Sequence, residues 1–164
     1  SDLSKHFSLD SFLLNSVRSS NISHKQWAKR RLTESLGGID GRRIAVWGLA
    51  YKSGTSTLRQ SASIELCVAL HSAGATVQAY DPSVRELPPE LAQKILLSAT
   101  AEGALEHADA LVVASNCSEF RELPADLVLT KLKDAVVLDG GRVCAGTLGE
   151  DPRIVYHSVG KSGI

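Results

Sequence analysis

The sequence predicts an α/β fold: a doubly wound, mostly parallel Rossmann-like sheet preceded by one long helix. Short apolar runs alternate with helical stretches from residue 41 onward, which is the pattern of consecutive βαβ units. Before them, residues 10–36 contain neither glycine nor proline. We expect the strand order 3-2-1-4-5-6, which puts the ligand site outside the carboxyl ends of the strands, where the order reverses.

The stretch at residues 10–36 has an imperfect helical stripe of apolar residues, formed by Leu13, Leu14, Val17, Trp27, Ala28 and Leu32. Gly37 and Gly38 supply its end. Such a helix would be on the order of 40 Å long, too long to pack wholly on one small domain. We therefore expect residues 1–38 to be a connecting or dimerisation helix and residues 39–164 to be the sheet domain.

The strands are expected at the short apolar runs: residues 43–48, 76–80, 95–97, 110–114, 135–139 and 154–158. The first, second and fifth of these end at or directly before glycine or aspartate. Helical patterns separate several of these runs, at residues 61–72, 101–108 and 127–132. The loops after residues 48, 80 and 139 should therefore meet at one edge of the sheet.

The charge balance excludes several kinds of partner. Lys plus Arg and Asp plus Glu number 18 each, so no field of one sign attracts nucleic acid or an anionic membrane. The three cysteines are widely spaced, with no CxxC and no histidine at metal-ligand spacing, which indicates free thiols and no metal site. With no signal-peptide pattern and no apolar run of membrane-spanning length, we expect a cytoplasmic protein.

The loop from Gly48 to Arg59 is the richest in polar chemistry. Only Gly48 and Gly54 are present, so the loop lacks the GxGxxG sequence that a dinucleotide pyrophosphate needs, which argues against NAD binding here. Lys52 can reach a phosphate, and hydroxyls follow at residues 53 and 55–57. The loop suits a nucleotide diphosphate held partly by side chains, with a solvated surface loop as the alternative.

Two further segments reach the same edge. Asp81 ends the second strand, where it could bind a ribose or cap a turn with Pro82. The Asp139–Arg142 segment ends the fifth strand, where Arg142 could grip a phosphate or lie exposed on a turn. The five histidines are scattered, and no nucleophile with an activating base can be assembled. No catalytic or cofactor-binding residue is therefore predicted.

Residues 48–62 resemble the GLAFKPxTDDxRxSP stretch of the UDP-glucose/GDP-mannose dehydrogenase family. Tyr51 replaces a phenylalanine, and the outright matches are Gly48, Leu49, Ala50, Lys52, Thr55, Arg59 and Ser61. Residues 79–82, 108–113, 119–120, 139–140 and 158–161 continue the resemblance, and Asn21 resembles part of the family's central helix.

The resemblance implies a nucleotide-sugar-binding C-terminal domain, for a UDP- or GDP-linked sugar, behind the end of the family's dimer-forming helix. Family members oxidise the C6 alcohol of the sugar to a carboxylate in two NAD-dependent steps. It also implies that the NAD domain and the catalytic cysteine lie upstream of this sequence. We therefore expect the chain to have no cofactor of its own, to be inactive alone, and to form a homodimer through the long helix.

By the same resemblance, Tyr51 and Lys52 should face the substrate, while Arg59 helps to hold the loop. The sequence departs from the family where Ser56 and Thr57 replace two aspartates and Gln60 replaces a glutamate. Gly141 also stands at the usual arginine position, so that Arg142 comes one place late. A non-catalytic partner- or ligand-binding module and a self-standing NAD(P)-binding domain remain the alternatives.

Overall fold

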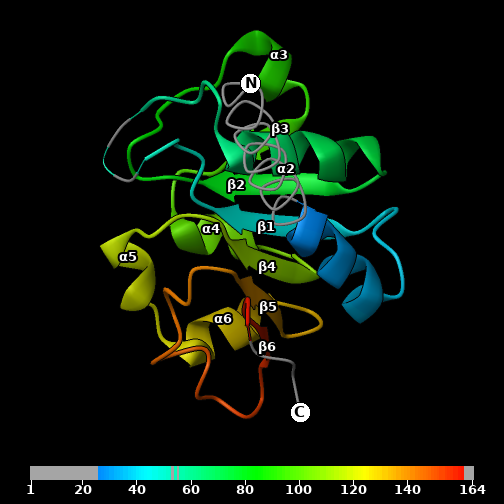
Figure 1. Cartoon of the computed structure of the whole chain (residues 1–164), viewed down its shortest axis with the longest axis vertical. Coiled ribbons are helices and arrows are strands. Elements are labelled where there is room, and N and C mark those ends of the chain that lie inside the picture. Colours follow the sequence, from blue (N-terminus) through cyan, green and yellow to red (C-terminus); the bar gives the residue numbers. More distant parts are fainter. Residues whose placement is uncertain (1–25, 53, 55, 161–164) are drawn as a thin grey trace, which may run out of the picture.

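The structure, a computed structural model, describes residues 26–52, 54 and 56–160. Its centre is a six-stranded sheet in the order β3-β2-β1-β4-β5-β6, and every neighbouring pair is parallel (Figure 1). The strands are β1 (Arg43–Trp47), β2 (Thr76–Tyr80), β3 (Ile95–Leu97), β4 (Ala110–Val113), β5 (Val136–Asp139) and β6 (Val155–His157). The predicted fold class and strand order are confirmed.

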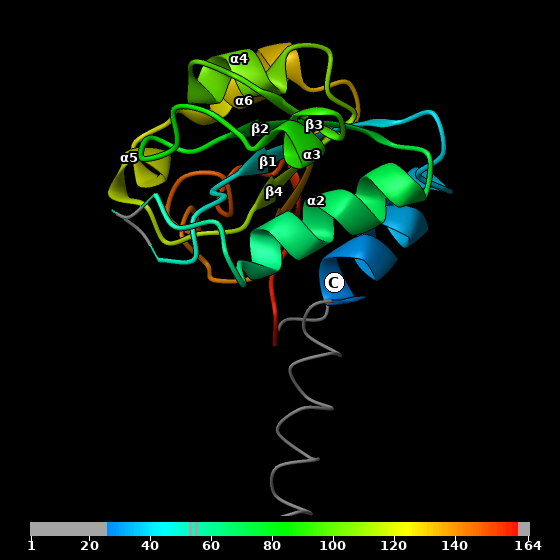
Figure 2. The same cartoon turned by 90° about the horizontal axis from the view of Figure 1, so that it is seen from above.

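The helices cover both faces of the sheet, as Figure 2 shows. α4 (Ala101–Leu105) and α6 (Ala125–Lys131) lie over one face, and α2 (Ala62–Ser72) lies over the other beside the helix at residues 26–36. Two further helices, α3 (Pro89–Ala92) and α5 (Ser118–Arg121), were not predicted. Each has four residues, which is too short to produce a helical repeat in the sequence.

The strands are apolar throughout because both of their faces are buried. β4 and β5 are buried at every position, as expected for central strands of a parallel sheet. On the α4 and α6 side, Trp47 stacks on Phe120 with the ring centroids 5.3 Å apart, and Trp47 Nε1 donates to the carbonyl of Ala101. These packed layers hold the carboxyl ends of the strands in fixed positions.

The predicted long helix is described from residue 26 to residue 36. Ala28 and Leu32 are buried in the core between this helix, α2 and the sheet, and Trp27 packs against the same core. These members of the apolar stripe therefore pack on the sheet domain itself. The remaining members, Leu13, Leu14 and Val17, lie outside the described residues.

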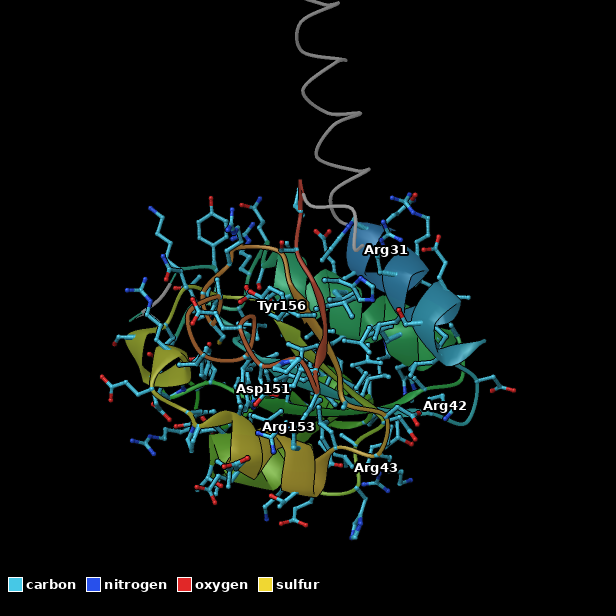
Figure 3. All side chains as sticks on the ribbon, turned by 90° about the horizontal axis from the view of Figure 1, so that it is seen from below. Arg31, Arg42, Arg43, Asp151, Arg153 and Tyr156 are labelled. Carbon is cyan, nitrogen blue, oxygen red and sulfur yellow. The ribbon has the colours of Figure 1, made fainter. Side chains whose placement is uncertain are left out.

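Arg42 joins the end of this helix to the amino edge of the sheet. Its guanidinium donates to the carbonyl of Leu36 at 3.1 Å and reaches the carboxylates of Asp109 and Asp134 at 3.4 and 3.2 Å (Figure 3). Asp109 also accepts the amide of Arg43 at 2.7 Å. The helix at residues 26–36 is thus fixed to the domain at its carboxyl end. No helix in the described part of the chain is long and apolar enough to cross a membrane.

Candidate functional site

The candidate site lies at the carboxyl edge of the sheet, on the side where α5 lies in Figure 1. Its first part is the loop that leaves β1 at Gly48. Gly48 has a φ of +96°, and a Cβ there would lie 2.1 Å from Ser115 Oγ. Glycine is therefore required, because the loops after β1 and β4 touch at this position.

Asp81 holds the start of the β1 loop. Its Oδ2 accepts the amides of Leu49 and Ala50 at 2.7 and 2.9 Å, and its Oδ1 accepts the amide of Ser83 at 2.9 Å. The residue is 5% exposed. Of the two roles considered for Asp81, this geometry supports the turn cap over the ribose ligand, because three protein amides already occupy the carboxylate.

The far end of the loop is fixed by Ser61, the N-cap of α2. Its hydroxyl donates to the carbonyl of Leu49 at 2.6 Å and accepts the amide of Ile64. Between these ends, the amide of Tyr51 donates to the carbonyl of Thr57 at 2.7 Å. The loop is therefore tied across its base at Tyr51, and Lys52 follows directly beyond the tie.

Both of these predicted substrate-binding side chains are exposed at the tip. Tyr51 is 56% exposed, and the ammonium of Lys52 lies 5.9 Å from the centroid of its ring. A cation at this distance is attracted by the face of the ring, which orients the lysine. Arg59 is also exposed, near the base of the loop. A cavity of about 860 Å³ opens beside the loop, lined by Ser56, Leu58 and residues 83–89.

The second part of the site is the turn after β5. Asp139 is fully buried; its Oδ1 accepts the amide of Val143 at 3.0 Å and its Oδ2 accepts the amide of Cys144 at 2.7 Å. The turn exposes Arg142, whose φ is +56° and whose amide donates to the carbonyl of Asp139 at 3.2 Å. Arg142 thus belongs to the same edge as the β1 loop, with the end of β4 between them.

Sequence reasoning treated Asp139 only as the start of a turn and did not single out Tyr156. The hydroxyl of Tyr156 donates to Asp139 Oδ2 at 2.7 Å from the neighbouring strand β6. The strand register carries the signal: Tyr156 pairs with Val137, two residues before Asp139, so both side chains lie on one face of the sheet. Nothing local in the sequence specifies that register.

The buried thiols are unsuited to nucleophilic chemistry. Burial raises the pKa of Cys67 to about 12, and burial together with the nearby Asp139 raises the pKa of Cys144 to about 12. Neither is therefore a thiolate near neutral pH. Among the described residues, no group of histidine, cysteine, aspartate and glutamate side chains is arranged to hold a metal ion.

The residues present do not fit NAD. A dinucleotide site needs backbone approach at closely spaced glycines and a free acid at the end of β2. Here the β1 loop is longer, and the Asp81 carboxylate is bonded to the amides of Leu49, Ala50 and Ser83. The site therefore has the position of a nucleotide site in a doubly wound sheet without the features of a dinucleotide site.

The architecture and the edge site define a Rossmann-like nucleotide-binding class of domain. Residues 45–146 match the UDP binding domain of the UDP-glucose/GDP-mannose dehydrogenase family, and the chain belongs to this family. UDP-glucose 6-dehydrogenase AglM of Haloferax volcanii is 40% identical over 113 residues, which cover 69% of this chain and 26% of that protein. UDP-glucose 6-dehydrogenase TuaD of Bacillus subtilis is 28% identical over 153 residues, which cover 93% and 33% respectively.

Solved structures agree with these relatives. The UDP-D-ManNAc dehydrogenase of Pyrococcus horikoshii aligns with a TM-score of 0.71 at 25% identity, covering 87% of this chain and 32% of that chain. The NDP-N-acetyl-D-galactosaminuronic acid dehydrogenase of Methanosarcina mazei aligns with a TM-score of 0.69 at 27% identity, covering 86% and 29%. The chain spans about a third of the length of the relatives it matches.

Proposed function

We propose that this chain binds the nucleotide half of a UDP- or GDP-linked sugar at the carboxyl edge of its sheet. The observation that supports this most is the β1 loop: Tyr51 and Lys52 are exposed at a tip whose base is tied by Asp81 and Ser61. A cation on a fixed loop is a suitable partner for a diphosphate. Arg142 provides a second cation at the same edge, and Arg59 lies near the base of the loop.

We further propose that the domain serves an NAD-dependent nucleotide-sugar 6-dehydrogenase, which oxidises the C6 alcohol of the sugar to a carboxylate. The family membership supports this activity, and NAD would be bound by another domain of the complete protein. The thiols of Cys67, Cys117 and Cys144 are free, as in a protein of a reducing, cytoplasmic compartment. Residues 1–38 are proposed as the connecting helix and homodimer contact, and residues 39–164 as the substrate domain.

The experiment is a thermal-shift panel on the purified chain with UDP, GDP, UDP-glucose, GDP-mannose and NAD, followed by calorimetric titration of each compound that shifts the melting temperature. A ligand that binds only the folded state stabilises it by about 2.7 kcal/mol at a hundred times its Kd. We expect at least one uridine or guanosine compound to raise the melting temperature and NAD to leave it unchanged.

The panel separates the proposal from its two alternatives. A shift with NAD alone would support a self-standing dinucleotide-binding domain. A lack of response to every compound would contradict nucleotide-sugar binding and favour a module that retains the fold for another partner. Light scattering on the same samples tests the homodimer, which a monomer at high protein concentration would contradict.

A further inference from the structure

Tyr156 forms a hydrogen bond to Asp139 that nothing in the local sequence predicts. It lies on β6, an edge strand, and its hydroxyl donates to Asp139 Oδ2 at 2.7 Å. Figure 3 shows it beside the orange loop that follows β5. Its residue partner in the sheet is Val137, so its hydroxyl reaches across to the carboxyl edge, where Asp139 ends β5.

The hydroxyl of Tyr156 acts as a donor throughout the ordinary pH range. Burial raises the pKa of Tyr156, and the hydrogen bond to Asp139 raises it further. The proton therefore stays on the phenol, and its hydrogen bond stabilises the buried carboxylate of Asp139. Ionisation of the phenol would instead place two negative groups in contact.

The Asp139 carboxylate, held by the hydroxyl of Tyr156, in turn holds the backbone of the turn after β5. Its two oxygens accept the amides of Val143 and Cys144, the two residues that follow Arg142. The thiol of Cys144 in turn donates to the carbonyl of Phe120 in α5 at 3.2 Å. A rotation of the carboxylate would lengthen one of these two hydrogen bonds, and both are made by the residues directly after Arg142, whose backbone is left-handed.

We propose that Tyr156 is a positioning residue for nucleotide binding: by orienting the Asp139 carboxylate, it fixes the turn that presents Arg142. This inference rests on the proposed function, because it assigns Arg142 to the nucleotide, and it extends the site to an edge strand. Tyr156 itself does not touch the ligand. Its contribution is to reduce the conformational freedom that Arg142 loses on binding.

The chain contains a matched control. Tyr80 also donates its hydroxyl to a carboxylate, that of Glu119, at 2.8 Å. Glu119 is exposed on α5, and its carboxylate lies outside the turn after β5. Tyr80→Phe therefore removes the same kind of bond as Tyr156→Phe while leaving the Arg142 turn intact.

The experiment compares the wild type, Tyr156→Phe and Tyr80→Phe by UDP titration, melting temperature and amide hydrogen exchange. For Tyr156→Phe we expect UDP affinity to fall about three- to tenfold, the size of the net contribution of one ordinary hydrogen bond, because the lost bond acts on the turn and not on the ligand. We also expect faster exchange at the Val143 and Cys144 amides. Tyr80→Phe should retain wild-type affinity and wild-type exchange at those two amides.

The outcomes separate the positioning role from a structural role and from the proposed function. Equal affinity for all three proteins, or unchanged exchange at Val143 and Cys144 in Tyr156→Phe, overturns the inference. A parallel loss of melting temperature and affinity in both variants indicates general stability and overturns it as well. If the wild type binds neither UDP nor GDP and exchange is still faster in Tyr156→Phe, the proposed function and the binding role are contradicted, while the Tyr156 constraint on the turn is established.

Discussion

The backbone segments that carry Lys52 and Arg142 are held in place in different ways. Lys52 lies on a loop tip whose base is closed by the bond from the Tyr51 amide to the Thr57 carbonyl. Arg142 instead lies in a turn and has a φ of +56°, a backbone conformation that residues other than glycine rarely adopt. Neither side chain is buried, so each can be replaced without disturbing the core.

Replacing Lys52 or Arg142 with alanine should weaken nucleotide-sugar binding by about tenfold or more each. Hydrogen bonds to charged groups are worth roughly 1.5–3 kcal/mol, and a diphosphate brings at least two negative charges to this edge. The melting temperature should barely change. Calorimetric titration of both variants tests this, with Lys94→Ala as the control, because Lys94 is an exposed lysine that precedes β3 at the opposite edge. Unchanged affinity in Lys52→Ala would exclude the β1 loop from the binding site.

The neighbouring glycine offers a test of why arginine stands at position 142. Gly141 has no left-handed φ, and a Cβ there would lie 3.4 Å from Val143 Cγ2, close to an ordinary contact. Arg142, which follows it, does have the left-handed φ. Glycine adopts a positive φ at little cost. The backbone therefore favours glycine at position 142 and arginine at position 141, the reverse of the order in the sequence.

The exchange of the two residues, Gly141→Arg with Arg142→Gly, should therefore raise the free energy of unfolding by about 0.5–1 kcal/mol. Urea unfolding of the wild type and the double variant measures this. If Arg142 binds the nucleotide from its present position, affinity should fall in the same variant although stability rises. Retained affinity would show that an arginine at either position serves the site.

At the scale of elements, β6 couples two parts of the molecule through its alternating side chains. Tyr156 faces the turn after β5, whereas the next residue, His157, faces the helix at residues 26–36 and contacts Ser35 Oγ at 3.0 Å. Burial lowers the pKa of His157, and the positive charge of Arg31 lowers it further, while Glu34 opposes the shift. The folded state therefore favours the neutral imidazole.

A lowered pKa in the folded state makes this contact sensitive to acid. The unfolded chain takes up a proton near pH 6.5 and the folded chain only at lower pH. The contribution of His157 is therefore fully present above pH 6.5 and is lost as the pH falls from there through the lower pKa of the folded state. The melting temperature of the wild type should decline more between about pH 7.5 and 5.5 than that of His157→Gln. His71→Gln, which replaces an exposed histidine in the last turn of α2, serves as the control and should follow the wild type.

At the scale of the whole molecule, the described part of the chain has the proposed nucleotide site and shows no features of a hydride-transfer centre. Incubation of the chain alone with NAD and UDP-glucose or GDP-mannose should produce no NADH above the rate without protein. The reason is that the thiols of Cys67 and Cys144 stay protonated and the β1 loop does not fit a dinucleotide. NADH formation that Cys117→Ser abolishes would refute this by identifying a nucleophile at the remaining cysteine.

The sequence was sufficient for the sheet because its signals are local. Short runs of consecutive apolar residues between polar turns predict strands buried on both faces, and the alternation with helices predicts the parallel order that the structure confirms. The exposed positions of Tyr51, Lys52 and Arg142 at the carboxyl edge follow from that order. The short helices α3 and α5 were missed because one turn leaves no repeat to detect.

What the sequence determined by itself is the fold, the family and the loops that form the edge site. Only the tertiary structure decided what holds those loops. The carboxylate of Asp81 accepts hydrogen bonds from the β1 loop, and the carboxylate of Asp139, oriented by Tyr156, accepts hydrogen bonds from the turn that presents Arg142. The physical reason is that a carboxylate can serve a ligand, a turn or a neighbouring strand equally well. Which partner it takes depends on strand register and burial, and both arise only when distant segments pack together.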